Sequence, residues 1–505
     1  MTTIHDIPPE ILAASFEVGI YAWGIGYLRP LSHVCQTWRD TIEHTPRLWG
    51  IITFTRSRSA AALLQQLAKA KNAPLALTIE PQSITRSAGK ANVRKDKEEA
   101  LKTLLERVGG WISVDVGTDL LAKCRWEDMG NLEKLVIRPS GSQNQAPGPF
   151  FASEFEWKSL KLHSFSTTGG VPNTWVTPFL KHCPSIRYFS LHTGNKSHTS
   201  QTSWHSKLHD IRDTWAYLVL VPNAYTIELT EVAHTTPTHI SPPPPILLRH
   251  LRNLRLREVR YAPAVLTTLI APSLQTLTLE HTRRERQAWS WLYTNSDIAA
   301  DADHRRHKLL LAPFFTQWSA PGAAPEHLHT LELKECLRSG DIPYLVRWLD
   351  RLPHLVRLVI QDDQVGAARK GDDADPDANL YLALSAPRTM TSQKNAGGNP
   401  LVGWLCPELM ILHLDTDHEL ADVISIASTR GGKVVQSGDS ERHIPPPARL
   451  RRIETRLCPM AEPKDLRLLR SLVDHISCVC TNCGLMLEPP SPGSIDIFLF
   501  YNGES

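Results

Sequence analysis

The chain has 505 residues, of which 42% are apolar and 21% are charged, so it can bury the core of one long domain or of several. Its formal net charge of +3 is small for this length and implies no overall attraction to nucleic acid or to an anionic membrane. No apolar run reaches the roughly eighteen residues that a membrane-spanning helix needs, so we expect none.

The cysteines and the N-terminal residues bear on the compartment. No apolar stretch typical of a signal peptide follows Met1, and the nine cysteines are an odd number. We therefore expect reduced thiols and a location in the cytoplasm, the nucleus or both.

The first predicted element is an amphipathic helix. Asp6 is placed as its N-cap, Pro8 and Pro9 suit its first turn, and Glu10 adds an early acidic residue. The residues that follow at helical spacing on one face are Ile11, Leu12, Ser15 and Phe16.

A second predicted helix follows a break. Gly19, Gly24 and Gly26 interrupt the helical pattern. The next helix is predicted to start at Pro30 and to end before Pro46. Its predicted apolar face consists of Leu31, Val34, Cys35 and Trp38. About fifty residues bury little surface alone, so this segment needs a partner or the next domain to pack against.

Taken together, residues 4–50 resemble an F-box. The resemblance lies in the run from Ile7 to Leu12, the run from Leu31 to Asp40, and the closing Thr45-Pro46-Arg47-Leu48-Trp49. It implies a helical module that binds the Skp-type adaptor of a cullin-RING ubiquitin ligase, in a chain that is not itself an enzyme. The residues that it implies for the adaptor contact are Ile7, Pro8, Ile11, Leu12 and Phe16 in a first patch, and Leu31, Val34, Cys35 and Trp38 in a second.

The segment departs from the family between Gly19 and Tyr27, where a glycine-rich stretch replaces a compact link that carries leucine. An alternative interpretation is that the same helices only cap an α/β domain, because an amphipathic helix with a tryptophan is often core.

Residues 51–130 are predicted to be a transition into a sheet. A helical face is expected around Leu63 and Leu67, and the segments 75–79 and 112–116 alternate as short strands. We expect both strands to be the first of the sheet that follows.

Residues 131–460 carry an irregular repeat in which an apolar residue is followed by a second one three positions later and a third two positions after that. Most steps between units are near the roughly twenty to thirty residues of leucine-rich repeats. The units begin at Leu132, Leu162, Ile186, Ala224, Leu251, Leu274, Leu328, Leu355, Leu409 and Leu450.

This pattern resembles the divergent leucine-rich repeats of many fungal F-box proteins. The resemblance implies an α/β fold, α+β overall: an irregular solenoid with a curved parallel sheet whose concave face holds a protein target. The Asn or Cys usual after each strand is mostly missing, and only Cys336 is close to it. Any parallel α/β domain with leucine-rich strands is the alternative.

Three segments are predicted to be loop insertions, near residues 192–205, 282–308 and 365–400, and residues 461–505 are predicted to be a C-terminal cap. The second insertion mixes arginines with tryptophans, but Glu285, Asp297 and Asp301 interrupt its basic residues, so we expect no nucleic-acid binding. The aspartates of the third lack the glycine and closing glutamate of a calcium loop.

Chemistry-bearing motifs are few. Cys478, Cys480 and Cys483 lie close together, with His475 and Cys458 upstream, but no standard second half of a zinc site accompanies them. We therefore expect reduced cysteines and neither metal nor cofactor. No phosphate-binding loop, Gly-x-Ser-x-Gly elbow or His-Glu-x-x-His motif is present.

The sequence thus predicts a non-catalytic substrate receptor of an SCF-type ubiquitin ligase, whose partners are the adaptor, the cullin reached through it, and a protein target. The alternative is a repeat scaffold without a ligase role, its N-terminal helices acting as a cap. The first hypothesis expects Leu12, Val34 and Trp38 to be partly exposed, and the second expects them to be buried. A hydrolase would instead show a deep pocket with His and carboxylate groups.

Overall fold

A computed structural model gives the fold. It describes residues 7–55, 57–80, 91–124, 128–139, 161–168, 171, 173–192, 211–232, 243–259, 262–281, 311–318, 325–337, 339–362, 379–394, 400–416, 418–431, 446–456, 462–479 and 486–487. The chain divides into two compact units, Met1–Ala224 and Tyr225–Ser505. Both combine parallel strands with helices, so the predicted mixed α/β class with a long parallel sheet is confirmed.

The first unit begins with five short helical elements. They are α1 (Pro9–Trp23), the 3-10 helix η2 (Ile25–Tyr27), α2 (Leu28–Leu31), α3 (Gln36–His44) and α4 (Pro46–Trp49). Pro8 occupies the N-cap position of α1, whereas the predicted cap Asp6 lies outside the described residues.

Two details of these helices differ from the prediction. Helix α1 runs through Gly19 and ends at Gly24, whose φ of 79° a side chain would strain. Gly19 is needed for close packing, since a Cβ there would lie 2.0 Å from Cε1 of Tyr27. The prediction of a single helix that starts at Pro30 and ends before Pro46 is wrong: α2 ends at Leu31, and the backbone is extended at Cys35 before α3 begins.

The sheet of the first unit has six described parallel strands in chain order, each hydrogen-bonded to the next. The strands are β1 (Ile51–Phe54), β2 (Leu75–Ile79), β3 (Trp111–Gly117), β4 (Lys134–Arg138), β5 (Ser164–Thr168) and β6 (Tyr188–His192). The helical elements after β1 are α5 (Ala60–Ala70), α7 (Ala91–Leu105), η3 (Val108–Gly110), α8 (Thr118–Leu121), α9 (Asn173–His182) and α10 (Ile211–Leu220). The two strands predicted in the transition segment are therefore confirmed as β2 and β3.

The sheet of the second unit continues the same arrangement of parallel strands in chain order, with an antiparallel strand added last. Its strands are β7 (Thr226–Thr230), β9 (Asn253–Arg257), β11 (Thr276–Glu280), β12 (Thr330–Lys334), β13 (Arg357–Gln361), β16 (Ile411–Asp415), β17 (Arg452–Thr455), β18 (His475–Cys478) and β19 (Met486–Leu487). Two small pairs stand apart from it: β8 (Ile246–Leu247) with β10 (Leu269–Ile270), and β14 (Arg388–Lys394) with β15 (Pro400–Gly403).

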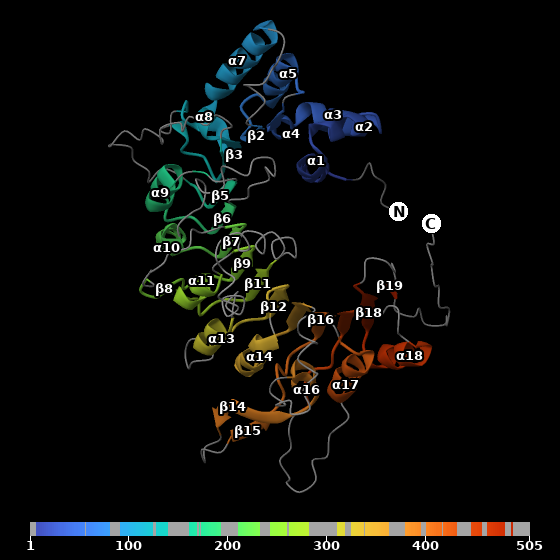
Figure 1. Ribbon diagram of the computed structural model, residues 1–505. Coiled ribbons are helices and arrows are strands. Elements are labelled where there is room, and N and C mark those ends of the chain that lie inside the picture. The colour runs from blue at the N-terminus through green and yellow to red at the C-terminus, as the bar shows by residue number, and fades with distance from the viewer. Residues whose placement is uncertain are drawn as a thin grey trace. The chain divides into compact units, whose positions relative to one another are not determined.

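Helices cover one face of this second sheet (Figure 1). They follow the strands in chain order, and each of the longer helices contacts the next. The helical elements are α11 (Ala262–Thr268), α13 (Ala312–Trp318), η9 (Ser339–Asp341), α14 (Ile342–Leu349), α16 (Leu380–Ser385), α17 (Leu420–Arg430) and α18 (Pro463–Leu472). The opposite face of the sheet, called the open face below, is formed by the alternate residues of each strand.

Leucine rows between sheet and helices form the core. In register, Leu254 pairs with Leu277, Leu277 with Leu331, and Leu331 with Leu358. The row continues to Leu412 and Ile453, and all its members are buried. These are middle positions of the repeat units predicted from the sequence, so parallel strands in register are what that pattern encodes.

The predicted insertions lie mostly outside the described residues, with one correction. Residues 379–394 of the third insertion form α16 and the strand β14 instead of a loop. The helix forms because Oδ1 of Asn379 accepts hydrogen bonds from the backbone N–H groups of Tyr381 and Leu382 at 3.0 and 3.2 Å. Tyr381 and Leu384 of this helix are buried.

Three strands end in the same strained turn. Glu231, Glu258 and Glu335 follow β7, β9 and β12 directly and have φ of 51°, 54° and 52°. The backbone N–H of Glu258 donates to the carbonyl of Glu280 at 2.7 Å, and the next residue, Val259, is buried. The left-handed conformation therefore turns the chain from the sheet back into the core.

Glu258 offers a test of this strain. We expect Glu258→Gly to be more stable than Glu258→Ala by about 1 kcal/mol, because a Cβ clashes at positive φ and glycine has none. Urea unfolding of the two variants measures the difference. In the middle of β7, where φ is ordinary, the order should reverse for Glu228, since glycine weakens a strand. The same order at both positions would contradict this account.

Candidate functional site

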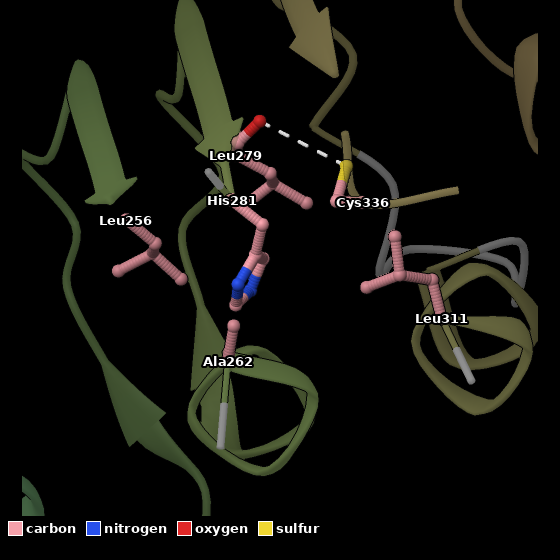
Figure 2. Close-up of a pocket in the computed structure, with 6 residues that line it drawn as sticks. All are labelled: Leu256, Ala262, Leu279, His281, Leu311 and Cys336. Atoms are coloured by element: carbon pink, nitrogen blue, oxygen red, sulfur yellow. Dashed lines mark hydrogen bonds between the residues drawn. The ribbon is translucent and has the colours of Figure 1, made fainter. Parts of the chain in front are cut away.

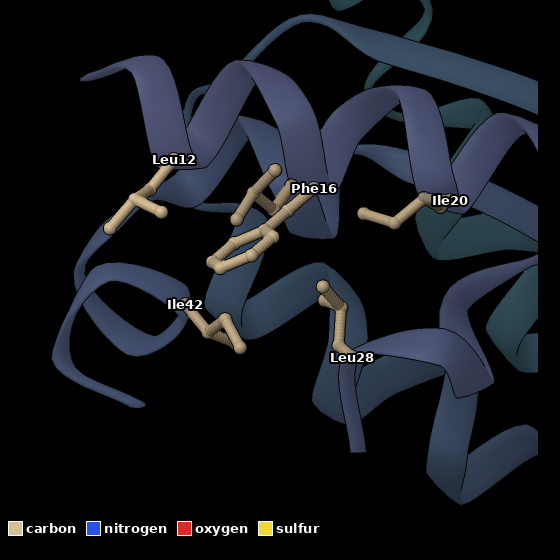
Figure 3. Close-up of a cluster of buried hydrophobic side chains, with 6 residues drawn as sticks. Leu12, Phe16, Ile20, Leu28 and Ile42 are labelled. Carbon is tan, nitrogen blue, oxygen red and sulfur yellow. The ribbon is translucent and has the colours of Figure 1, made fainter. Parts of the chain in front are cut away.

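The N-terminal helices enclose their own small core (Figure 3). Leu12, Phe16 and Ile20 project from one face of α1 toward Leu28 and Ile42, and Leu48 completes the cluster. The Phe16 and Trp38 rings pack edge to face with centroids 5.1 Å apart. Leu12 and Phe16 are therefore core residues in this conformation. The burial of Leu12 is what the cap hypothesis expects, whereas the exposure of Val34 and the partial exposure of Trp38 are what the receptor hypothesis expects.

The other predicted adaptor-contact residues lie at or near the surface. Ile7, Pro8, Ile11 and Val34 are exposed, whereas Leu31, Cys35 and Trp38 are half-buried. Leu31 and Trp38 pack against the core cluster, so they link it to the surface. The structure thus divides the predicted set into residues that hold the module together and residues that are free to meet another chain.

Helix α1 exposes apolar side chains beyond Phe16, where the predicted apolar face ends. Ile11 is 58% exposed and Val18 is 70% exposed, and their seven-residue spacing places both opposite the buried face. Tyr21 extends this exposed surface toward the end of the helix, whereas Trp23 follows Phe16 by seven residues and packs on Tyr27, with ring centroids 4.8 Å apart. The missed signal was the continuation of the helical period beyond Phe16, where Gly19 had been expected to end the helix. We use the name outer apolar surface for the exposed apolar side chains of the N-terminal helices. They are Ile7, Ile11 and Val18 on and just before α1, and Val34 in the separate segment between α2 and α3.

The module is also anchored to the first strand. Leu48 is fully buried, and the indole N–H of Trp49 donates to the carbonyl of Ile42 at 2.9 Å. The side-chain amide of Gln66, from α5, donates to the carbonyls of Trp49 and Ile51, both at 2.8 Å. These bonds fix α4 and β1 against α5, so the helices hold a defined place at the start of the first unit.

A second candidate surface is the open face of the sheet in the second unit, where charged side chains from neighbouring strands pair. Nε of Arg257 lies 3.1 Å from Oε1 of Glu280. Nζ of Lys334 lies 3.1 Å from Glu332, which also meets Arg357 at 3.5 Å. Farther along, Glu454 meets Arg452, and Arg456 pairs with Asp415. Three of these pairs join neighbouring strands, whereas Lys334 with Glu332 and Arg452 with Glu454 each lie within one strand.

His413 and Glu454 form the most enclosed of these pairs. Nδ1 of His413 lies 2.5 Å from Oε2 of Glu454, and Nε2 lies 3.2 Å from Nε2 of Gln361. Burial alone would raise the pKa of the Glu454 carboxyl. The hydrogen bond and charge of His413, aided by Arg452 and Arg357, outweigh that effect and lower this pKa below its ordinary value. Glu454 is therefore a carboxylate at neutral pH.

Features of a catalytic or metal centre are not found in the part of the chain that the structure describes. One small pocket lies between β9, β11 and α11, lined by Leu256, Leu279 and Leu311 with Ala262, His281 and Cys336 (Figure 2). Its cavity volume is about 10 Å³, which suits a single water. The Cys336 thiol donates to the carbonyl of Leu279 at 3.8 Å.

The predicted cysteine cluster is only partly visible. Cys478 is half-buried in β18, and Cys458, Cys480 and Cys483 lie outside the described residues. Within the described ranges, no three His, Cys, Asp or Glu side chains gather closely enough to hold a metal ion. Burial raises the pKa of the Cys124, Cys183 and Cys406 thiols to about 12. Among the described helices, none has the length and apolar character that a bilayer crossing requires.

Comparison with known proteins adds no relative. No family model matches the chain, and the search of the curated proteins finds no match.

Proposed function

We propose that the chain is the substrate receptor of an SCF-type cullin-RING ubiquitin ligase. Residues 4–50 act as an F-box that binds the Skp-type adaptor. The body is a divergent leucine-rich-repeat-like solenoid that binds a protein target. One observation carries the proposal most: the N-terminal helices bury a core of their own around Phe16 and still expose the outer apolar surface of Ile7, Ile11, Val18 and Val34. An apolar surface of this kind is stabilised when another polypeptide covers it.

The proposed function needs no chemistry on this chain. The adaptor connects the receptor to the cullin, and the sheet holds the target near the ubiquitin-charged enzyme. Acceleration then comes from a raised effective concentration of the target at the transferring enzyme. The rigid link from α4 to β1 through Leu48 and Gln66 supports this role, because it keeps the docking module in a fixed relation to the strands next to it.

A scaffold without a ligase role is the second candidate, and the same link favours it. If the helices serve only to cover the first strand, complete burial of Leu48 and the hydrogen bonds of Gln66 account for their presence. The outer apolar surface distinguishes the two candidates, because a cap has no use for exposed Ile11 and Val18.

The test is co-purification with the adaptor. Ile11→Arg with Val34→Arg places two charges on the outer apolar surface. We expect the amounts of adaptor and cullin that co-purify with this double variant to fall at least about tenfold. Its matched control is Val219→Arg on α10, which is 58% exposed, as Ile11 is. The control should retain both partners. Thermal unfolding should show all variants folded, since the substituted side chains are exposed.

Two outcomes decide against the ligase. If the unaltered chain captures other proteins but neither adaptor nor cullin, the scaffold function is the right one. If the double variant and the control retain equal adaptor, the outer apolar surface is not the binding site.

A further inference from the structure

We propose that the open face of the second unit's sheet binds an acidic, extended segment of another protein through a layer of arginines. The inference rests on the target-binding role proposed above, but not on the adaptor. The arginines concerned are Arg255, Arg257, Arg357, Arg452 and Arg456, and we call them the arginine layer.

The layering comes from unequal exposure within each ion pair. The arginine side chains are 42–54% exposed, while the carboxylates with which they pair, on Glu280, Glu332, Asp415 and Glu454, are 15–24% exposed. The carboxylates therefore lie close to the sheet and the guanidinium groups lie above them. A molecule that approaches this face meets cationic hydrogen-bond donors first.

An arginine that pairs with one carboxylate can still donate to a second anion. A guanidinium has five N–H groups, and pairing with one carboxylate uses at most two of them. The pairing also holds the side chain in place, so less conformational entropy is lost when a ligand carboxylate binds. The face is thus prepared for anions although its basic and acidic groups nearly balance.

The near balance of basic and acidic groups on the open face indicates which kind of partner fits it. A nucleic acid needs a strongly basic surface and aromatic rings on which its bases can stack. The described open-face positions from β7 to β18 include Thr226, Ile411 and Ser477 beside the charged residues, and no Phe, Tyr or Trp. Thr278 and Val359, in the middle of β11 and β13, are on this face but buried. A phosphate dianion would be repelled by the underlying carboxylates more than a carboxylate would. A peptide with aspartate or glutamate side chains therefore fits best.

Strand order sets the spacing that the peptide would need. Arg255, Arg357 and Arg452 lie on β9, β13 and β17. The sheet order places three steps between the first pair and two between the second. With about 4.8 Å per step, the gap from Arg357 to Arg452 is about 10 Å. Arg255 lies in the row of Val359, two residues along the strand from Arg357, so the gap from Arg255 to Arg357 is about 16 Å. An extended chain covers these gaps in about three and about five residues. Arg357 and Arg452 share one row across the sheet, since both pair with Ile411.

The experiment uses the full chain without the adaptor, so its outcome is independent of the ligase proposal. The probe is a fluorescein-labelled serine–alanine peptide of about ten residues with three glutamates at these two spacings. Its control has glutamine in place of each glutamate. Fluorescence anisotropy should show that the acidic peptide binds at least about tenfold more tightly, with an affinity that falls as salt is added.

Variants that are expected to weaken binding and a variant that is expected to tighten it make the test specific. Arg255→Gln, Arg357→Gln and Arg452→Gln combined should weaken acidic-peptide binding at least about tenfold. Arg347→Gln removes one positive charge on the helical side of the same unit and should leave binding unchanged, whereas Arg357→Gln alone, an equal charge change on the open face, should weaken it. Glu332→Gln removes a half-buried carboxylate that competes for Arg357 and should tighten binding about twofold or more. A mere loss of folding could not produce that gain.

The proposal is overturned if the acidic and glutamine peptides bind equally. It is also overturned if oligo(dT) binds more tightly than the acidic peptide and depends on the same arginines.

Discussion

Phe16→Ala is expected to melt the N-terminal helices and to abolish adaptor binding. Phe16 is buried between Leu12, Ile42 and the Trp38 ring, so its removal leaves a cavity in a core of only six buried side chains. Losses of about 3–5 kcal/mol are typical for such a truncation. A small core has few other contacts to offset that loss. Hydrogen exchange of the amides in α1 and α3 measures the opening directly.

Ile11→Ala is the matched control, because it lies on the same helix but on the opposite face. Ile11 is 58% exposed, so its truncation should change the free energy of unfolding by no more than about 0.5 kcal/mol. It should still weaken adaptor retention, because the side chain belongs to the outer apolar surface. If Ile11→Ala opened the helices as much as Phe16→Ala, the two faces of α1 would be wrongly assigned.

The contrast between these two residues shows where sequence reasoning stops. Ile11, Leu12 and Phe16 follow a helical period, and that period was sufficient to predict a helix. The period alone does not show which of these apolar residues are buried and which are exposed. That choice depends on where Leu28 and Ile42 pack, and these belong to helices whose boundaries were predicted wrongly.

The strands were the part that could be predicted most fully. A buried strand alternates with a period of two, and Leu277 and Leu279 display that alternation within five residues. Parallel order follows, since each pair of strands is separated by a helix or a long connection. Glu258 and Glu335 could not be predicted as left-handed turn positions, because glycine or asparagine is the usual sign of that conformation.

The arginine layer could not be predicted from the sequence, for a different reason. The register between strands places Arg257 directly opposite Glu280 and places Arg357 diagonally across from Glu332. The repeat aligns the buried leucines of these strands, but it contains no recurring residue at the exposed positions, so it does not indicate that they form ion pairs. In a single strand, an arginine next to a leucine indicates only an exposed position.

Arg430→Met is expected to destabilise the second unit by roughly 3 kcal/mol or more. Arg430 is fully buried at the end of α17, and its guanidinium is satisfied by backbone carbonyls. Nε donates to Leu384 at 3.1 Å, Nη1 donates to Cys406 at 3.2 Å, and Nη2 donates to Leu405. Methionine fills a similar volume but leaves three buried acceptors without donors, each costing about 1–3 kcal/mol.

These three carbonyls explain why an arginine is needed there. Leu384 lies in the last turn of α16, where carbonyls lack helical partners, and Cys406 has a φ of 47° that turns the chain toward β16. Burial lowers the pKa of the Arg430 guanidinium to about 10, so it stays charged at neutral pH. Arg430→Lys should also destabilise, because one ammonium cannot span three separated acceptors. Urea unfolding and hydrogen exchange of residues 379–431 measure the effect, and a methionine variant as stable as the unaltered chain would show that the carbonyls find other donors.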